Sequence, residues 1–165
     1  MSEDLSNKAF QQLIEAVREA GALLLSMWPK PQGDVSAMGV SHKGDGTLVS
    51  AADMASNEIL TAALRKLYPK DFVFSEEVAS DPAAVSAATR TWIIDPLDGT
   101  SAFLDGRDDF SVLVGLAEHH SAHSGILFLP ARDQMFVAQA GKGAFCNGKR
   151  IHVSEHSRAR DGHVY

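Results

Sequence analysis

The chain has 165 residues, of which 45% are hydrophobic, and its 21 acidic and 15 basic side chains give a net charge of −6. A chain of this size can bury one sizeable core, so we expect residues 1–165 to form a single domain. No basic surface points to a nucleic acid polymer or an anionic membrane as partner. The lone cysteine, Cys146, excludes an internal disulfide framework, and no apolar run is long enough for a signal sequence or a membrane span. These features predict a cytoplasmic protein.

Two amphipathic helices are predicted in the first half of the chain. Apolar residues recur at helical spacing over residues 6–28 and again over residues 55–67. Between the helices, a segment rich in Gly, Pro and polar residues predicts a loop through residue 46, followed by a short strand at 47–51. Asp53 then falls in the first turn of the second helix.

The rest of the chain predicts strands. A short strand at residues 72–74 carries Glu76 to its end, and the residues from Trp92 onward form a buried strand that runs into an acidic loop. Three further β-like runs predict an antiparallel meander, at 110–116, 125–129 and 135–140. Asn147-Gly148 then predicts a hairpin between residues 145–146 and 150–153. Residues 78–90 form a connection whose structure the sequence leaves open.

The loop after the buried strand combines charge with turn residues. Asp95 and Asp98 lie three residues apart around Pro96, and a buried carboxylate without a partner is costly, so the pair calls for cations. Oxygen ligands alone suit a hard ion such as Mg²⁺. Gly99 lets the backbone approach a ligand closely, and Thr100 opens a helical turn whose N–H groups can face an anion. The alternative for any one of these acids is a helix cap or a surface turn.

Other candidate residues receive simpler interpretations. His119, His120 and His123 fall where a turn is due, and we expect a solvated turn rather than a metal cluster. Cys146 is expected to be a small packing residue rather than a nucleophile. Glu77 is expected at the surface or behind a direct ligand.

Four motifs together resemble those of the inositol monophosphatase family. They are VSAAD at residues 49–53, SEE at 75–77, DPLDGT at 95–100 and GKGAFCNG at 141–148. They occur in the family's order and at similar spacing. The resemblance implies an α+β layered sandwich in which two N-terminal helices pack on a largely antiparallel sheet. It also implies a Mg²⁺-dependent, lithium-sensitive phosphatase whose substrate is a small phosphorylated alcohol such as inositol monophosphate. A 3'(2'),5'-bisphosphate nucleotidase is the alternative within the same family.

The resemblance also implies a metal site. Glu76, Asp95 and the main-chain carbonyl of Leu97 would hold the first Mg²⁺. Asp95 would bridge to a second ion that Asp98 also binds. Two ions on a phosphate ester can stabilise both the attacking and the leaving oxygen.

The catalytic roles are likewise those that the resemblance implies. The Thr100 hydroxyl, hydrogen-bonded to Asp53, would orient a water molecule and take its proton. Main-chain N–H groups of Gly99 and Thr100 would cradle the substrate phosphate. Lys43 and Asp45 lie where the family has a mobile loop that can help to bind a further metal.

The sequence departs from the family pattern at its C-terminal side. Family members continue into a second α/β domain with a motif resembling W-D-x-A-A-G, whereas the tryptophans here are Trp28 and Trp92 and neither belongs to such a motif. The chain thus resembles the N-terminal metal-binding domain with the C-terminal α/β domain missing. Three readings stay open: an active phosphatase, a truncated domain that binds metal or phosphate with little or no catalysis, and a domain with surface acids only. An uncovered sheet face would favour a homodimer or other self-association.

Overall fold

The computed structural model describes residues 7–29, 41–42, 48–49, 51–79 and 81–155. Its helices are α1 (Lys8–Met27), α2 (Ala51–Leu67), α3 (Pro82–Ala87), α4 (Thr100–Leu104) and the 3₁₀ turn η2 (Pro130–Arg132). Its strands are β1 (Ser41–His42), β2 (Leu48–Val49), β3 (Phe72–Ser75), β4 (Arg90–Asp98), β5 (Ser111–Glu118), β6 (Ser121–Leu129), β7 (Gln134–Gln139), β8 (Gly143–Cys146) and β9 (Lys149–Ile151). Within this described part, no helix is both long and apolar enough to cross a membrane.

Seven strands form one sheet in chain order, from β3 at one edge to β9 at the other. β3 runs parallel to β4, and every later neighbour is antiparallel. Antiparallel neighbours need only short turns, which is why the meander follows the chain. The β8–β9 turn shows this: Asn147 and Gly148 have φ of 47° and 76°, as a two-residue hairpin turn of type I′ requires. The Asn147 side chain also accepts a 2.8 Å hydrogen bond from the Met135 N–H.

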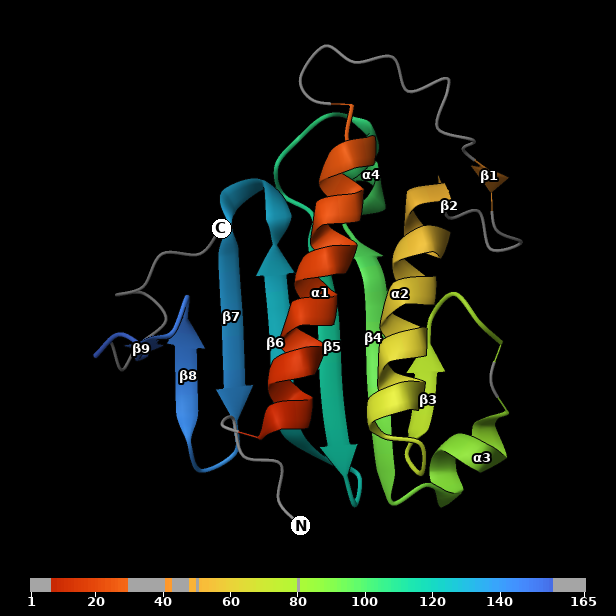
Figure 1. The fold of residues 1–165 in the computed structure, drawn as a ribbon, viewed down its shortest axis with the longest axis vertical. Coiled ribbons are helices and arrows are strands. Elements are labelled where there is room, and N and C mark those ends of the chain that lie inside the picture. The colour runs from red at the N-terminus through yellow and green to blue at the C-terminus, as the bar shows by residue number, and fades with distance from the viewer. Residues whose placement is uncertain (1–6, 30–40, 43–47, 50, 80, 156–165) are drawn as a thin grey trace.

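Helices α1 and α2 lie side by side on one face of this sheet (Figure 1). The N-terminus of α1 is capped by Asn7, whose Oδ1 accepts a 2.9 Å bond from the Ala9 N–H. Alternate residues of β5, such as Val112 and Val114, point toward the helices and are at most 2% exposed. The largest fully buried side chain of the core is Trp92 on β4. The core therefore lies between the helix layer and one face of the sheet.

The opposite face of the sheet carries apolar residues that neither α1 nor α2 covers. Side chains alternate along a strand, so the register partners of Ile93 share its face across the sheet. These partners are Gly115, Gly125, Ala138 and Ala144 on β5 to β8. Most of this row lines a groove of about 370 Å³, and Ile93 is 47% exposed. The structure thus has the apolar face that the sequence leads us to expect.

The structure confirms the predicted class, two N-terminal helices on a largely antiparallel sheet, and corrects several local predictions. The connection left open at residues 78–90 contains α3, and the predicted interhelix loop contains β1. The turn predicted at 119–124 spans only two residues, because β6 begins at Ser121. Backbone pairing between β5 and β6 continues as far as Glu118 and Ser121, past a bulge at the register shift between Leu116 and Ala117. Lys43 and Asp45 lie outside the described residues.

Candidate metal centre

The C-terminal ends of β3 and β4 meet the N-terminal end of α2 at one end of the sheet (Figure 1). Ser75 pairs with Ile94 in the parallel register, so the next residues, Glu76 and Asp95, lie side by side where β3 ends and β4 continues. The Glu76 N–H donates to the Ile94 carbonyl at 3.4 Å, which continues this pairing. Asp53 lies in the first turn of α2. The topology therefore brings together acids from three separate segments of the chain.

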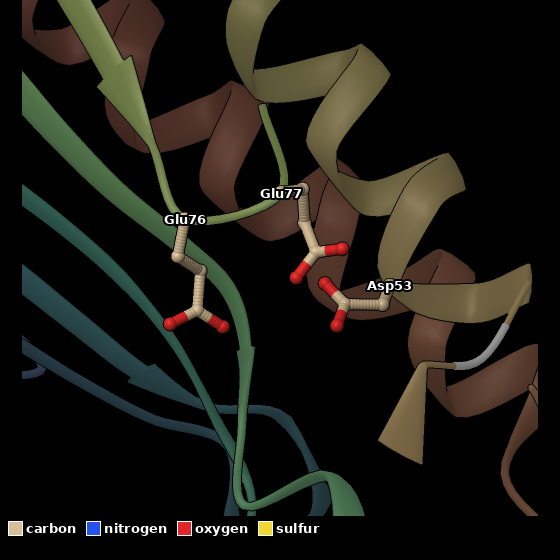
Figure 2. Close-up of side chains that lie close together, drawn as sticks. All are labelled: Asp53, Glu76 and Glu77. Atoms are coloured by element: carbon tan, nitrogen blue, oxygen red, sulfur yellow. The ribbon is translucent and has the colours of Figure 1, made fainter. Parts of the chain in front are cut away.

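Three carboxylates form the acidic cluster, which we define as Asp53, Glu76 and Glu77. Each offers an oxygen atom, and the three oxygens lie within 4.8 Å of one another. Figure 2 shows the carboxylates of Asp53 and Glu77 facing each other, with Glu76 beside them. Asp53 is 1% exposed, Glu77 is half-buried and Glu76 is exposed. Like charges at this spacing repel, and burial strengthens the repulsion, so a cation would stabilise the cluster.

Asp95 stands next to the acidic cluster and is electrostatically coupled to it. Burial raises the pKa of Asp95 from its usual 3.8 to about 6, with the charges of Glu76 and Asp98 adding to the effect and a hydrogen bond from the Leu97 backbone opposing it. Its Oδ1 atom is buried and has no hydrogen-bond partner among the described residues. A buried carboxylate oxygen that lacks a donor is suited to bind a cation. Oxygen donors alone fit Mg²⁺ or Ca²⁺ rather than a soft metal.

Asp98 ends β4 in an irregular stretch of the strand. The pairing with β5 shifts between Asp95 and Asp98, which places Asp98 opposite Ser111. Ser111 Oγ donates a 3.2 Å hydrogen bond to Asp98 Oδ2. Pro96, which has no N–H to donate, lies within the shift, where a proline is tolerated. The stretch that the sequence predicts as a loop is therefore the bulged end of a strand, and such a bulge re-aims side chains.

Gly99 and Thr100 begin α4 directly after this strand. Gly99 has φ 81° and ψ 36°, a left-handed conformation that favours glycine. Thr100 Oγ1 donates to the Leu97 carbonyl at 3.1 Å. A hydroxyl has a single proton, so in this arrangement Thr100 donates to Leu97 and not to Asp53, with which the resemblance pairs it. The Leu97 carbonyl keeps a second lone pair for another ligand.

The structure brings together the acids singled out from the sequence, while their roles as ligands stay predictions. Glu77, expected at the surface or behind a direct ligand, is half-buried and contributes an oxygen to the acidic cluster, because the turn after β3 folds it back toward α2. Of the three histidines, His119 and His120 occupy the exposed turn as predicted, whereas His123 lies in β6 with Nε2 3.7 Å from Glu118 Oε2. Sequence reasoning also missed buried Ser56, Asn57 and Ser75. The signal was present, because the two α2 residues continue the helical stripe that starts at Asp53.

The structure thus has two helices layered on a mostly antiparallel sheet, with acids from strand ends and a helix start close enough together to hold a metal ion. The chain belongs to the inositol monophosphatase family, whose profile matches residues 6–165.

Individual relatives agree with this assignment. The chain is 31% identical over 142 residues to inositol monophosphatase 1 of Xenopus laevis, an alignment that covers 86% of this chain and 49% of that protein. It is 32% identical over 144 residues to a histidinol-phosphatase of Chlorobaculum parvum, which covers 87% and 52% respectively. The crystal structure of the extragenic suppressor protein suhB from Bartonella henselae superimposes with a TM-score of 0.81 at 32% identity, over 92% of this chain and 57% of that one. The chain thus spans about half the length of the relatives it matches.

Proposed function

We propose that this chain is the metal-binding part of a Mg²⁺-dependent phosphomonoesterase that hydrolyses a small phosphorylated alcohol, such as an inositol monophosphate. The observation that carries the proposal is the convergence of carboxylate oxygens from Asp53, Glu76 and Glu77 within 4.8 Å. Asp95, whose buried Oδ1 has no hydrogen-bond partner within the described part of the chain, interacts electrostatically with Glu76 and Glu77 and supports the same interpretation. Two of the relatives are named as phosphatases, one for inositol monophosphate and one for histidinol phosphate.

The proposed ligand set follows the positions of the acids. Glu76, Asp95 and the Leu97 carbonyl would hold one Mg²⁺, and Asp95 and Asp98 would hold a second. When bound, Mg²⁺ would stabilise the charge on the phosphate oxygens and would lower the pKa of the nucleophilic water. The hydrogen bond from Ser111 to Asp98 leaves the other Asp98 oxygen for a ligand.

The remaining residues orient the substrate and the nucleophilic water, and take a proton from that water. Asp53, buried at the edge of the acidic cluster, is the proposed base. It receives the proton through Thr100 Oγ1, whose own hydrogen turns from the Leu97 carbonyl toward Asp53. Main-chain N–H groups at Gly99 and Thr100, which begin a helix and so have no partner within it, donate to the substrate phosphate.

A second candidate is a domain that binds metal and phosphate but has little or no catalysis of its own. The chain spans about half the length of those relatives, so hydrolysis is tested separately from metal binding. Within the catalytic proposal, a 3'(2'),5'-bisphosphate nucleotidase is the alternative substrate class. Lithium sensitivity, a cytoplasmic location and self-association through the apolar sheet face belong to the proposal as well.

Phosphate release by the full 165-residue chain tests these candidates. The substrates are inositol 1-phosphate, histidinol phosphate and adenosine 3',5'-bisphosphate, each with and without Mg²⁺. Asp98→Asn removes a proposed ligand, and Asp105→Asn is its matched control, because Asp105 is an exposed carboxylate at the far end of α4. Release that needs Mg²⁺ and Asp98 but not Asp105 supports the enzyme. Mg²⁺ binding that needs Asp98, without release on any substrate, supports the binding domain instead.

A further inference from the structure

Helix α2 begins with a buried stripe that is polar rather than apolar. Asp53, Ser56 and Asn57 share one helical face and are 1%, 0% and 6% exposed, whereas Leu60 and Leu64 continue the same stripe as ordinary core residues. Burying a hydroxyl or an amide is costly unless it is hydrogen-bonded. The partners of Ser56 and Asn57 therefore show what these residues do.

Ser56 ties α2 to the acidic end of β4. Its Oγ donates a 2.8 Å hydrogen bond to the carbonyl oxygen of Pro96, 40 residues further along the chain and fully buried. Pro96 lies between Asp95 and Asp98, in the stretch where the strand register shifts. Ser56 and Asp53 are both on α2, so this bond holds Asp95 and Asp98 of β4 at a defined position relative to Asp53.

Asn57 ties α2 to the acidic turn after β3. Ser75 Oγ donates to Asn57 Oδ1 at 2.7 Å and accepts a bond from the Glu77 N–H at 3.2 Å. The Val78 N–H closes the turn on the Ser75 carbonyl at 3.2 Å. The chain of bonds from Glu77 through Ser75 to Asn57 holds both glutamates against the start of α2.

We propose that Ser56 and the Asn57–Ser75 pair are positioning residues, which hold the two acidic segments at the spacing that a divalent cation requires. The inference rests on the proposed function, because it assumes that the acids bind Mg²⁺. These contacts are uncharged and buried, so they act without adding charge to a site that already carries several carboxylates. Mutual repulsion would otherwise push the segments apart, and partners behind metal ligands commonly change metal affinity by about 10–100-fold.

The test measures Mg²⁺ binding to the ion-free full-length chain. The dissociation constant comes from calorimetric titration with MgCl₂ and, independently, from the rise of the unfolding midpoint with Mg²⁺ at constant ionic strength. Ser56→Ala and Ser75→Ala are each expected to weaken binding about tenfold or more. Ser75→Thr keeps the hydroxyl on a β-strand and is expected to stay within about twofold of the wild type.

Two control variants separate positioning from stability. Ser26→Ala removes a hydroxyl that donates to the Leu23 carbonyl at an exposed position of α1, and it should leave Mg²⁺ binding unchanged. Leu60→Val trims the core side of α2 and should lower the unfolding midpoint without weakening Mg²⁺ binding. All titrations are made at a temperature where circular dichroism shows each variant folded.

The possible results are distinguishable. Wild-type binding of Mg²⁺ that Asp98→Asn abolishes, together with unchanged binding in Ser56→Ala and Ser75→Ala, overturns the positioning role alone. A loss in these two variants that is no greater than in Leu60→Val overturns it as well. A wild type that binds no Mg²⁺ overturns the proposed function and this inference with it.

Discussion

Replacing Gly99 by alanine should destabilise the protein through a clash with the backbone that leads into β5. An added β-carbon would lie 2.8 Å from the Asp109 carbonyl oxygen and 3.3 Å from the Phe110 Cα. Phe110 is 1% exposed and packs against the rings of Trp28 and Phe103, at 5.6 and 5.0 Å, so this backbone has little room to retreat. The left-handed φ of 81° costs alanine about 1 kcal/mol and the overpacking about 1–3 kcal/mol more.

The control for this prediction is Gly148→Ala. Gly148 has a similar φ of 76°, but an added β-carbon there meets nothing within 4 Å. The difference between the two variants therefore isolates the steric contribution. Urea unfolding followed by circular dichroism should show Gly99→Ala losing about 1–3 kcal/mol more than Gly148→Ala. Equal losses in the two variants would refute the reasoning from close packing.

Three further predictions concern charge and surface. Because burial and neighbouring carboxylates raise the pKa of Asp95 from 3.8 to about 6, the folded ion-free protein binds this proton more tightly than the unfolded chain does. The resulting stability is fully present below about pH 4 and is lost as the pH rises through about 6. This contribution to the free energy of unfolding amounts to about 1–2 kcal/mol after allowance for solvent screening. Urea unfolding of Asp95→Asn should lack this change between about pH 4 and 6, and the same change in the variant as in the wild type would contradict the prediction. Arg90 pairs with two partly buried carboxylates, so Arg90→Met should lower the free energy of unfolding by about 2 kcal/mol. Arg107 pairs at an exposed position, so Arg107→Met should lower it by less than about 1 kcal/mol. Equal losses of the two variants in urea unfolding would contradict the argument from burial. Ile93→Lys on the uncovered sheet face should lower the proposed self-association, measured as a concentration dependence in sedimentation velocity, and a profile unchanged from the wild type would exclude this face as the contact.

Much of the secondary structure could be predicted because its causes are local. The apolar stripe of residues 6–28 predicts α1 to within two residues of its observed bounds, Lys8–Met27. The Asn147-Gly148 hairpin follows from the ease with which these two residues adopt positive φ. Where local signals were weak the predictions were less accurate, as at His123, which lies in a strand because the pairing of β5 with β6 extends into the residues expected to form a turn.

The candidate site was only partly predictable, for a related reason. Asp95 and Asp98 could be singled out from their spacing around a proline, and Asp53 from its place in the first turn of a helix. The inclusion of Glu77 depends on a turn that Ser75 stabilises through the Glu77 N–H. No property of Glu77 alone distinguishes it from a surface glutamate.

By itself, the sequence determined most element types, the antiparallel meander and the identity of most acids at the candidate site, because apolar periodicity, turn residues and motif spacing are encoded over short stretches of chain. Only the tertiary structure decided which acids meet and what holds them. The hydrogen bond from Ser56 to Pro96 joins residues 40 positions apart, and the bond from Ser75 to Asn57 joins residues 18 apart. Such contacts exist only after β3, β4 and α2 have packed together, because neither partner has a local pattern that specifies the other.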